Sequence, residues 1–140
     1  EKDKSHVVPA IIVKFYEAIV QKKKEVVLWG DGTPTRDLLF IEDLTDALLL
    51  SMFSESNVSP INIGSGNEIS ILDLANLIRD LMGGTFKIIW DTTKANGQPR
   101  RILDISRAKN ELGFKPKTSI NEGLKQTIQF YIEKCSNVPT

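Results

Sequence analysis

Helical and strand-like patterns alternate along this chain from one end to the other. Apolar residues recur at helical spacing after Pro9, and a short apolar run at 26–29 then stops at glycines. Changes between a 3.6-residue period and short apolar runs predict helices that alternate with buried strands. The alternation is typical of the α/β class. In chain order, the predicted elements are a helix from Pro9, a strand at 26–29, a helix at 43–53, a strand at 60–64, a helix from Ser70, a strand at 86–90, a short helix capped by Ser106 and ending at Gly113, and a helix from Ser119.

The composition excludes several classes of function. With 18 basic and 18 acidic residues, the chain has no net charge that would draw it to nucleic acid or to an anionic membrane. Cys135 is the single cysteine and His6 the single histidine, which is too few for an internal disulfide or a Cys/His zinc site. No apolar stretch is long enough to span a bilayer, and no signal segment opens the chain. We therefore expect a soluble cytoplasmic protein without a metal, a nucleic-acid partner or a membrane partner.

Two polar loops carry side chains suited to binding an anion. In the loop 29–37, glycines permit a tight turn, and Arg36 offers a planar fork of donors that matches phosphate oxygens. The loop 94–101 carries three cations and little that could pack in a core, so it could serve as a lid over a diphosphate. Taken alone, the first loop also fits a plain turn with a surface arginine, and the second also fits a solvated connector.

Three further features carry groups that could take part in chemistry. His6 is the lone histidine, and histidine as a residue type suits acid/base work, although a lone histidine is also a common capping or packing residue. No histidine or helix N-terminus lies near Cys135 in the sequence, so this thiol is predicted to be inert. The glycines at 64 and 66 follow a predicted strand, but the third glycine of the dinucleotide fingerprint is absent. The segment 64–68 is therefore rejected as a dinucleotide site.

Several segments together resemble the C-terminal half of the extended short-chain dehydrogenase/reductases, the NAD-dependent epimerase/dehydratase family. The resemblance covers nearly the whole chain and implies a Rossmann-type epimerase or dehydratase fold. The segments that carry it are 27–32 followed by Arg36 and Asp37, the helix start at 40–44, the strand and glycines at 61–66, and the closing segment 104–116.

Within that family, two segments are similar to the GDP-L-fucose synthases. They are 5–10, with the histidine, and 94–97, with the lysine. This resemblance implies that the chain binds a nucleotide sugar, namely a GDP-4-keto-6-deoxy-hexose. It also implies that His6 is an acid/base catalyst acting with a cysteine outside this chain. The implied binding residues are Arg36 and Lys94 for the diphosphate, and Val7, Ile11, Leu28 and Trp29 for the nucleotide pocket.

Two features of the family are absent from these 140 residues. The glycine-rich cofactor loop and the Tyr-x-x-x-Lys catalytic pair both lie upstream in the family. We therefore expect residues 1–140 to be a substrate-binding C-terminal portion without the Rossmann core, which is inactive alone and binds no cofactor. The intact enzyme would use NADP or NAD, and residues 43–64 would pack on its N-terminal Rossmann half. The apolar runs at 38–41, predicted to be buried on both sides, and at 47–53 would then leave apolar surface through which the isolated chain self-associates.

Two alternatives remain open from the sequence. One is the C-terminal portion of a UDP-sugar 4-epimerase or of a sugar-nucleotide dehydratase. The other belongs to a different class, a binding or interaction module without catalysis. A cofactor loop and a Tyr-x-x-x-Lys pair upstream would favour an enzyme over such a module.

Overall fold

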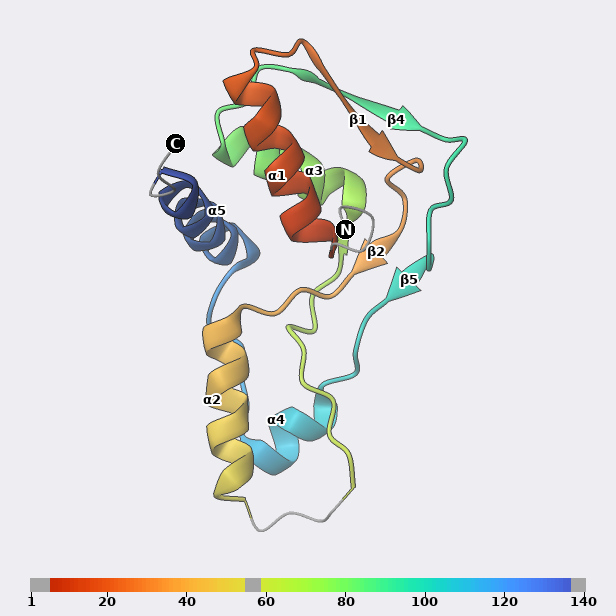
Figure 1. Ribbon diagram of the computed structural model, residues 1–140. Coiled ribbons are helices and arrows are strands. Elements are labelled where there is room, and N and C mark those ends of the chain that lie inside the picture. The colour runs from red at the N-terminus through yellow and green to blue at the C-terminus, as the bar shows by residue number, and fades with distance from the viewer. Residues whose placement is uncertain (1–5, 55–58, 137–140) are drawn as a thin grey trace.

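The computed structural model describes residues 6–54 and 59–136, and it shows the mixture of helices and short strands that the sequence predicts. In Figure 1, α1, α3, α5, β1 and β4 form an upper part, while α2 and α4 form a lower part. The elements in chain order are α1 (Val7–Val20), β1 (Glu25–Trp29), β2 (Thr35–Arg36), α2 (Ile41–Met52), β3 (Ile69–Ser70), α3 (Ile71–Leu81), β4 (Lys87–Asp91), β5 (Arg100–Arg101), α4 (Ser106–Leu112) and α5 (Ile120–Ser136).

The upper part is built around strands β1 and β4, which pair in parallel with Leu28 opposite Trp90. Val26 and Leu28 are buried, whereas Val27 and Trp29 on the other face are about half exposed. The prediction of a fully buried strand at 26–29 was therefore wrong for one face. Side chains alternate across a strand, and in this two-stranded sheet only the buried face packs in the upper core.

The upper core joins these strands to α1, α3 and α5. Phe15 is completely buried, and its ring centroid lies 4.8 Å from that of Phe86. Leu74 and Ile78 of α3 are also completely buried, because they recur at helical spacing on its inner face. Each such side chain contributes about 1.5–3 kcal/mol through burial, so α1 and α3 are held firmly against the strands.

A second, smaller core holds the lower part together. Ala47 of α2 packs with Ala108 and Leu112 of α4 and with Phe114 beyond it. Gly113 ends α4 in the left-handed conformation at φ +66°, and the Phe114 amide then donates to the Ala108 carbonyl at 3.1 Å. The predicted helix end at Gly113 is thus confirmed, and it turns Phe114 back into the core.

Three very short strands link the two parts. β2 lies in the middle, antiparallel to β3 and parallel to β5, with Thr35 opposite both Ser70 and Arg100. The Thr35 amide donates to the Pro99 carbonyl, and the Asp37 amide donates to the Arg101 carbonyl, each at 2.9 Å. Polar loops distant in sequence therefore meet at β2.

Several predicted local signals are confirmed. Ser70 caps α3, with its Oγ accepting from the Asp73 amide at 3.0 Å, and Ser119 accepts in the same way from the Glu122 amide at 3.2 Å. α1 begins two residues before Pro9, which is compatible with proline because amides of a first turn have no helical partner.

Three local predictions were wrong. No strand forms at 60–64, since no described strand lies beside this segment, although Ile61 and Ile63 pack on the lower core. The run 38–41 is not a strand buried on both sides, because residues 38–40 are half buried and irregular while Ile41 is the exposed first residue of α2. Ser106 is the first helical residue of α4 and not its cap, because its amide donates to the Asp104 carboxylate at 2.9 Å.

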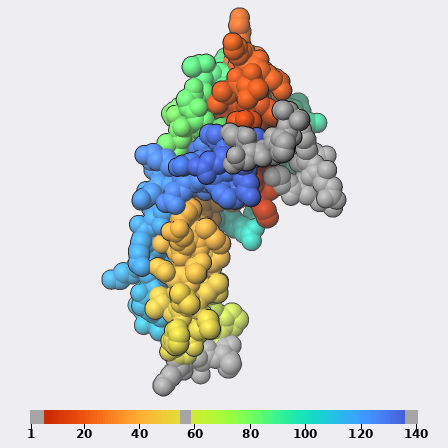
Figure 2. All heavy atoms as spheres, turned by 60° about the vertical axis from the view of Figure 1, so that its left-hand side comes forward, coloured from red at the N-terminus to blue at the C-terminus, as the bar shows by residue number. Residues whose placement is uncertain are grey.

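One face of α2 leaves large apolar side chains at the surface. Met52 is 74% exposed and Phe53, directly after the helix, is 84% exposed, with Leu48 and Leu49 also exposed. Figure 2 shows α2 lying open along the lower part of the molecule. The apolar surface expected from the sequence is thus present, while self-association through it stays a prediction. Among residues 6–54 and 59–136, no helix is both long and apolar enough to cross a membrane.

Candidate functional site

A glycine turn follows β1 and presents Asp31. Gly30 and Gly32 adopt φ values of +81° and +79°, which only glycine adopts without strain. The Asp31 carboxylate accepts from the amide and the hydroxyl of Thr33 at 2.9 and 2.7 Å. These two bonds, and to a lesser extent a hydrogen bond with the Asn96 side chain, hold the pKa of Asp31 below its ordinary value. The turn is therefore closed by its own side chains.

The loop that follows β4 docks onto this turn. Asn96 accepts from the Asp31 amide at 2.8 Å, and a Cβ built on Gly30 would lie 2.2 Å from the Asn96 amide oxygen. Gly30 is thus required for the close approach of two loops that are 65 residues apart in sequence. At the base of the second loop, Asp91 accepts from the hydroxyl and amide of Thr93, which lowers the pKa of Asp91.

Arg36 lies where these loops meet β2. Its Nη1 donates to the carbonyls of Thr35 and Gln98 at 2.7 and 2.8 Å, and the side chain is half buried. Within the part of the chain that the structure describes, no carboxylate forms an ion pair with Arg36. A guanidinium fixed by neutral carbonyls keeps its full positive charge, and that charge is suited to an anionic ligand.

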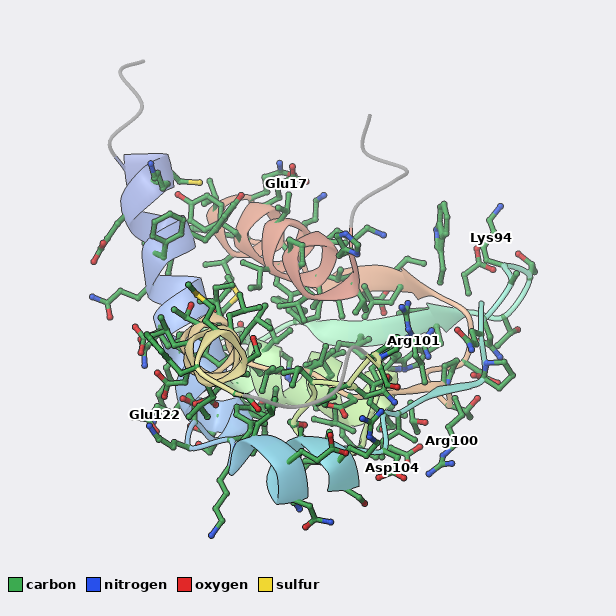
Figure 3. The ribbon with its side chains drawn as sticks, turned by 90° about the horizontal axis from the view of Figure 1, so that it is seen from below. Glu17, Lys94, Arg100, Arg101, Asp104 and Glu122 are labelled. Carbon is green, nitrogen blue, oxygen red and sulfur yellow. The ribbon has the colours of Figure 1, made fainter. Side chains whose placement is uncertain are left out.

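Trp29 is exposed, and two lysines lie close to its ring. Its side chain is 56% exposed, and Lys14 and Lys94 place their ammonium groups 5.7 and 6.0 Å from its ring centroid. Figure 3 shows Lys94 on the outer loop, with Arg100 and Arg101 on the segment leading back from it. The sequence did not single out Lys14, because its sole signal is a charged position on the mostly apolar helix α1.

The remaining predicted residues lie deeper or further along. Ile11 and Leu28 are buried in the upper core, at 4% and 5% exposure, and half-buried Val7 packs against it. His6 is exposed at the N-cap of α1 and makes no side-chain capping bond there. The structure thus joins Trp29, Arg36 and Lys94 through contacts of their loops, while the roles of His6, Val7, Ile11 and Leu28 stay predictions.

The glycines at 64 and 66 form an anion-binding turn, and its anion comes from the chain itself. Asp37 accepts from the Ser65 amide at 2.8 Å, the Ser65 hydroxyl at 2.6 Å and the Gly66 amide at 3.1 Å. Consecutive amides that point to one place would also suit a phosphate, but here a carboxylate occupies them. The expectation that 64–68 binds no dinucleotide stays a prediction.

A separate groove of about 610 Å³ runs between the segment before α2 and helix α5. None of the described residues lining it is charged, and most are apolar, including Val8, Phe40, Leu124 and Phe130. An apolar groove cannot replace the hydration of a diphosphate. Although this hollow is large, the surface that bears Arg36, Trp29 and Lys94, called the cation cluster below, is the better candidate for an anionic ligand.

No metal centre is found in the described part of the chain. Among these residues, no three side chains of His, Cys, Asp or Glu come together in a group that could hold an ion. The candidate site is therefore a surface of cations, one indole ring and glycine turns.

Comparison with known proteins identifies the class to which this fold and site belong. Over its whole length the chain superposes on a GDP-L-fucose synthetase from Naegleria fowleri bound to NADP, with a TM-score of 0.89 and 27% identity, and it covers 44% of that chain. It also superposes on a UDP-glucose 4-epimerase from Thermotoga maritima determined with UDP-glucose, with a TM-score of 0.83 and 27% identity, over 96% of this chain and 42% of that one. The fold is the C-terminal portion of a Rossmann-type epimerase or reductase.

The family follows from the sequence match. Residues 1–127 match the family described as GDP-mannose 4,6 dehydratase, and the chain belongs to this family. It is 41% identical to GDP-L-fucose synthase 1 of Arabidopsis thaliana over 135 residues, and 41% identical to the GDP-L-fucose synthase of Sinorhizobium fredii over 133 residues. These matches take in 96% and 95% of this chain but 42% of each relative. The resemblance drawn from the sequence is thereby confirmed.

Proposed function

We propose that this chain supplies the nucleotide-sugar site of an NADP-dependent epimerase/reductase that acts on a GDP-4-keto-6-deoxy-hexose. One observation carries the proposal: among the described residues, no carboxylate neutralises Arg36, which lies beside the loops that bear Trp29 and Lys94. The relatives named GDP-L-fucose synthase support this choice of substrate class.

In this proposal, Arg36 and Lys94 bind the diphosphate. The described hydrogen bonds of Arg36 use Nη1, so its Nε and Nη2 are directed to phosphate oxygens. The two carbonyl bonds fix the guanidinium before the ligand arrives, which lowers the entropy lost on binding. Lys94 adds a second, more mobile charge from the loop above.

Trp29 and Lys14 extend the same site. The exposed indole face offers a flat apolar surface for the nucleoside, and the two lysines beside it attract the neighbouring phosphates. Val7 borders this pocket, while Ile11 and Leu28 support it from the core below.

The chemistry itself needs groups outside this chain. His6 acts as the acid/base group of the epimerisation, together with a cysteine of the N-terminal half. NADP binds that half, which carries the glycine-rich cofactor loop in the family, whereas the glycine turn at 64–66 of this chain is occupied by Asp37. This chain alone therefore binds nucleotide but transfers no hydride.

The N-terminal half packs on the lower part of the molecule. Residues 43–64 include the exposed apolar face of α2, with Leu48, Leu49 and Met52. Contact with a Rossmann domain would bury this face and remove the surface through which the isolated chain self-associates.

A second candidate function is a UDP-sugar 4-epimerase. It is favoured by the similarity to the Thermotoga enzyme determined with UDP-glucose. Both functions use the diphosphate in the same way and differ in the base, so parallel titrations with GDP and UDP distinguish them.

The test uses titration calorimetry of the full-length protein with GDP. Arg36→Ala removes a hydrogen bond to a charged group, worth about 2 kcal/mol, so the Kd for GDP should rise about 30-fold. Arg36→Lys should recover part of this loss, since a point charge cannot replace the planar fork. In steady-state kinetics, Lys94→Ala should raise KM more than it lowers kcat, because the contact of Lys94 with the diphosphate exists in both ground and transition states.

A matched control removes a positive charge elsewhere. Lys125 lies exposed on α5, and Lys125→Ala should leave the GDP affinity unchanged. If Arg36→Ala binds GDP as tightly as the parent, the diphosphate does not lie at this cluster and the proposal is wrong.

A further inference from the structure

Glu68 occupies an unusual position relative to the three short strands. It directly precedes β3, and its carboxylate reaches across β2 to β5 on the far side. Arg100 of β5 donates from Nε to Oε1 at 2.8 Å and from Nη2 to Oε2 at 3.0 Å. Between them, the Thr35 hydroxyl of β2 also donates to Oε1. One side chain thus links all three strands.

The strand that Glu68 holds is the anchor of the loop carrying Lys94. β5 is an edge strand of two exposed residues, Arg100 and Arg101, which directly follow the loop. A two-residue edge strand has little stability of its own, so a bidentate side-chain pair is a substantial part of what fixes it. Arg100, one member of the pair, lies six residues from Lys94 along the chain.

The pairing of Glu68 with Arg100 also leaves Arg36 available to bind an anion. Arg36 on β2 lies directly opposite Arg101, and Arg100 is the next residue on the same edge strand. Glu68 pairs with Arg100 and leaves Arg36 bonded to carbonyls. Arg100 and Thr35 also hold the pKa of Glu68 at about 2, so the carboxylate stays ionised at any physiological pH.

We propose that Glu68 is a positioning residue that latches β5 onto β2, and thereby holds the loop 92–99 and Lys94 over the diphosphate site. The proposal rests on the proposed function, since it assigns Glu68 a role in that same site. In this role Glu68 acts through Arg100 and Thr35, to which it is hydrogen-bonded.

The test compares five variants of the full-length protein, one of them Arg36→Ala, by GDP titration and by hydrogen exchange of the loop 92–99. Glu68→Gln keeps the shape of the side chain and removes its charge. The Kd for GDP should rise by up to about fivefold, which is the upper end of the range for losing an exposed ion pair. Amides of 94–97 should exchange faster, while those of α3 should exchange as in the parent.

The remaining variants determine whether Glu68 acts through Arg100. Arg100→Gln should have the same effect as Glu68→Gln, and the double variant should be no worse than either, because both changes break one interaction. The matched control is Glu111→Gln, which breaks another bidentate pair, with Arg107 on α4, and should change neither readout.

The outcomes separate the latch from the site itself. If Glu68→Gln has the GDP affinity and the loop exchange of the parent, the proposed role of Glu68 is wrong. The role is also wrong if the effects of the two substitutions add in the double variant. Should Arg36→Ala weaken GDP binding in the same series while Glu68→Gln does not, the latch alone is wrong. Should Arg36→Ala have no effect, the proposed function fails whatever Glu68 does.

Discussion

Replacing Gly64 with alanine should push the Asp37 carboxylate out of the glycine turn that it occupies. A Cβ at this position would lie 2.7 Å from Asp37 Oδ2, the oxygen that accepts from the Gly66 amide at 3.1 Å. The substitution brings no backbone strain, because the φ of Gly64 is not positive. The expected loss of stability therefore comes from the displacement of one carboxylate oxygen.

The magnitude follows from the bond that is lost. A hydrogen bond to a charged group contributes about 1.5–3 kcal/mol. Alanine reduces the entropy of the unfolded chain and returns about 0.4–1 kcal/mol of this loss. We expect Gly64→Ala to lower the free energy of unfolding by about 1.5 kcal/mol.

A double-mutant cycle with Asp37→Ala isolates this cause. Once the carboxylate is gone, the contact left at the new Cβ is Leu103 Cβ at 3.3 Å, so Gly64→Ala should then cost less than about 0.5 kcal/mol. Urea unfolding of the four full-length variants gives the coupling energy. A Gly64→Ala cost that is equal in both backgrounds would refute the reasoning that Asp37 fills the turn.

Three further predictions concern the catalyst, the buried acid and the latch. His6→Gln should slow epimerisation by about 100-fold and leave the GDP affinity unchanged, since its proposed role is proton transfer; steady-state kinetics and calorimetry check this. Asp43 is 3% exposed and accepts from two main-chain amides before α5 at 3.2 and 3.0 Å, so Asp43→Ala should lower the free energy of unfolding by about 3 kcal/mol in urea titrations. Bonds from Arg100 and Thr35 lower the pKa of Glu68 from 4.5 to about 2, so its stabilisation is complete above pH 4.5 and is lost as the pH falls toward 2. The difference in Tm between the parent and Glu68→Gln should therefore be constant above about pH 5 and shrink below pH 4.5; a difference that persists at pH 2 would contradict this assignment.

The sequence predicted the elements whose causes are local. The cap at Ser70, the stop at Gly113 and the apolar periodicity around Phe15 each act within a few residues, and each appears in the structure as expected. The strand at 60–64 failed for the opposite reason. An apolar run becomes a strand only when another strand pairs with it, and the described residues place none there.

The sequence singled out the residue types of the candidate site but not the contacts between them. The loops suggested Arg36 and Lys94 because cations and glycines are visible in a sequence. The docking of Asn96 on the Asp31 amide, the approach of Lys14 to Trp29 and the bonds from Glu68 to Arg100 are contacts across the fold. No spacing rule predicts such contacts, since they depend on how separate elements pack.

The central claim is that a nucleotide sugar places its diphosphate against Arg36 and Lys94. A crystal structure of the full-length protein with a GDP-sugar measures this most directly. We predict phosphate oxygens at about 3 Å from the Arg36 guanidinium and the Lys94 ammonium, with Trp29 beside the nucleoside. A diphosphate seated on the amides of Ser65 and Gly66 in place of the Asp37 carboxylate, or one bound away from Arg36, would contradict it.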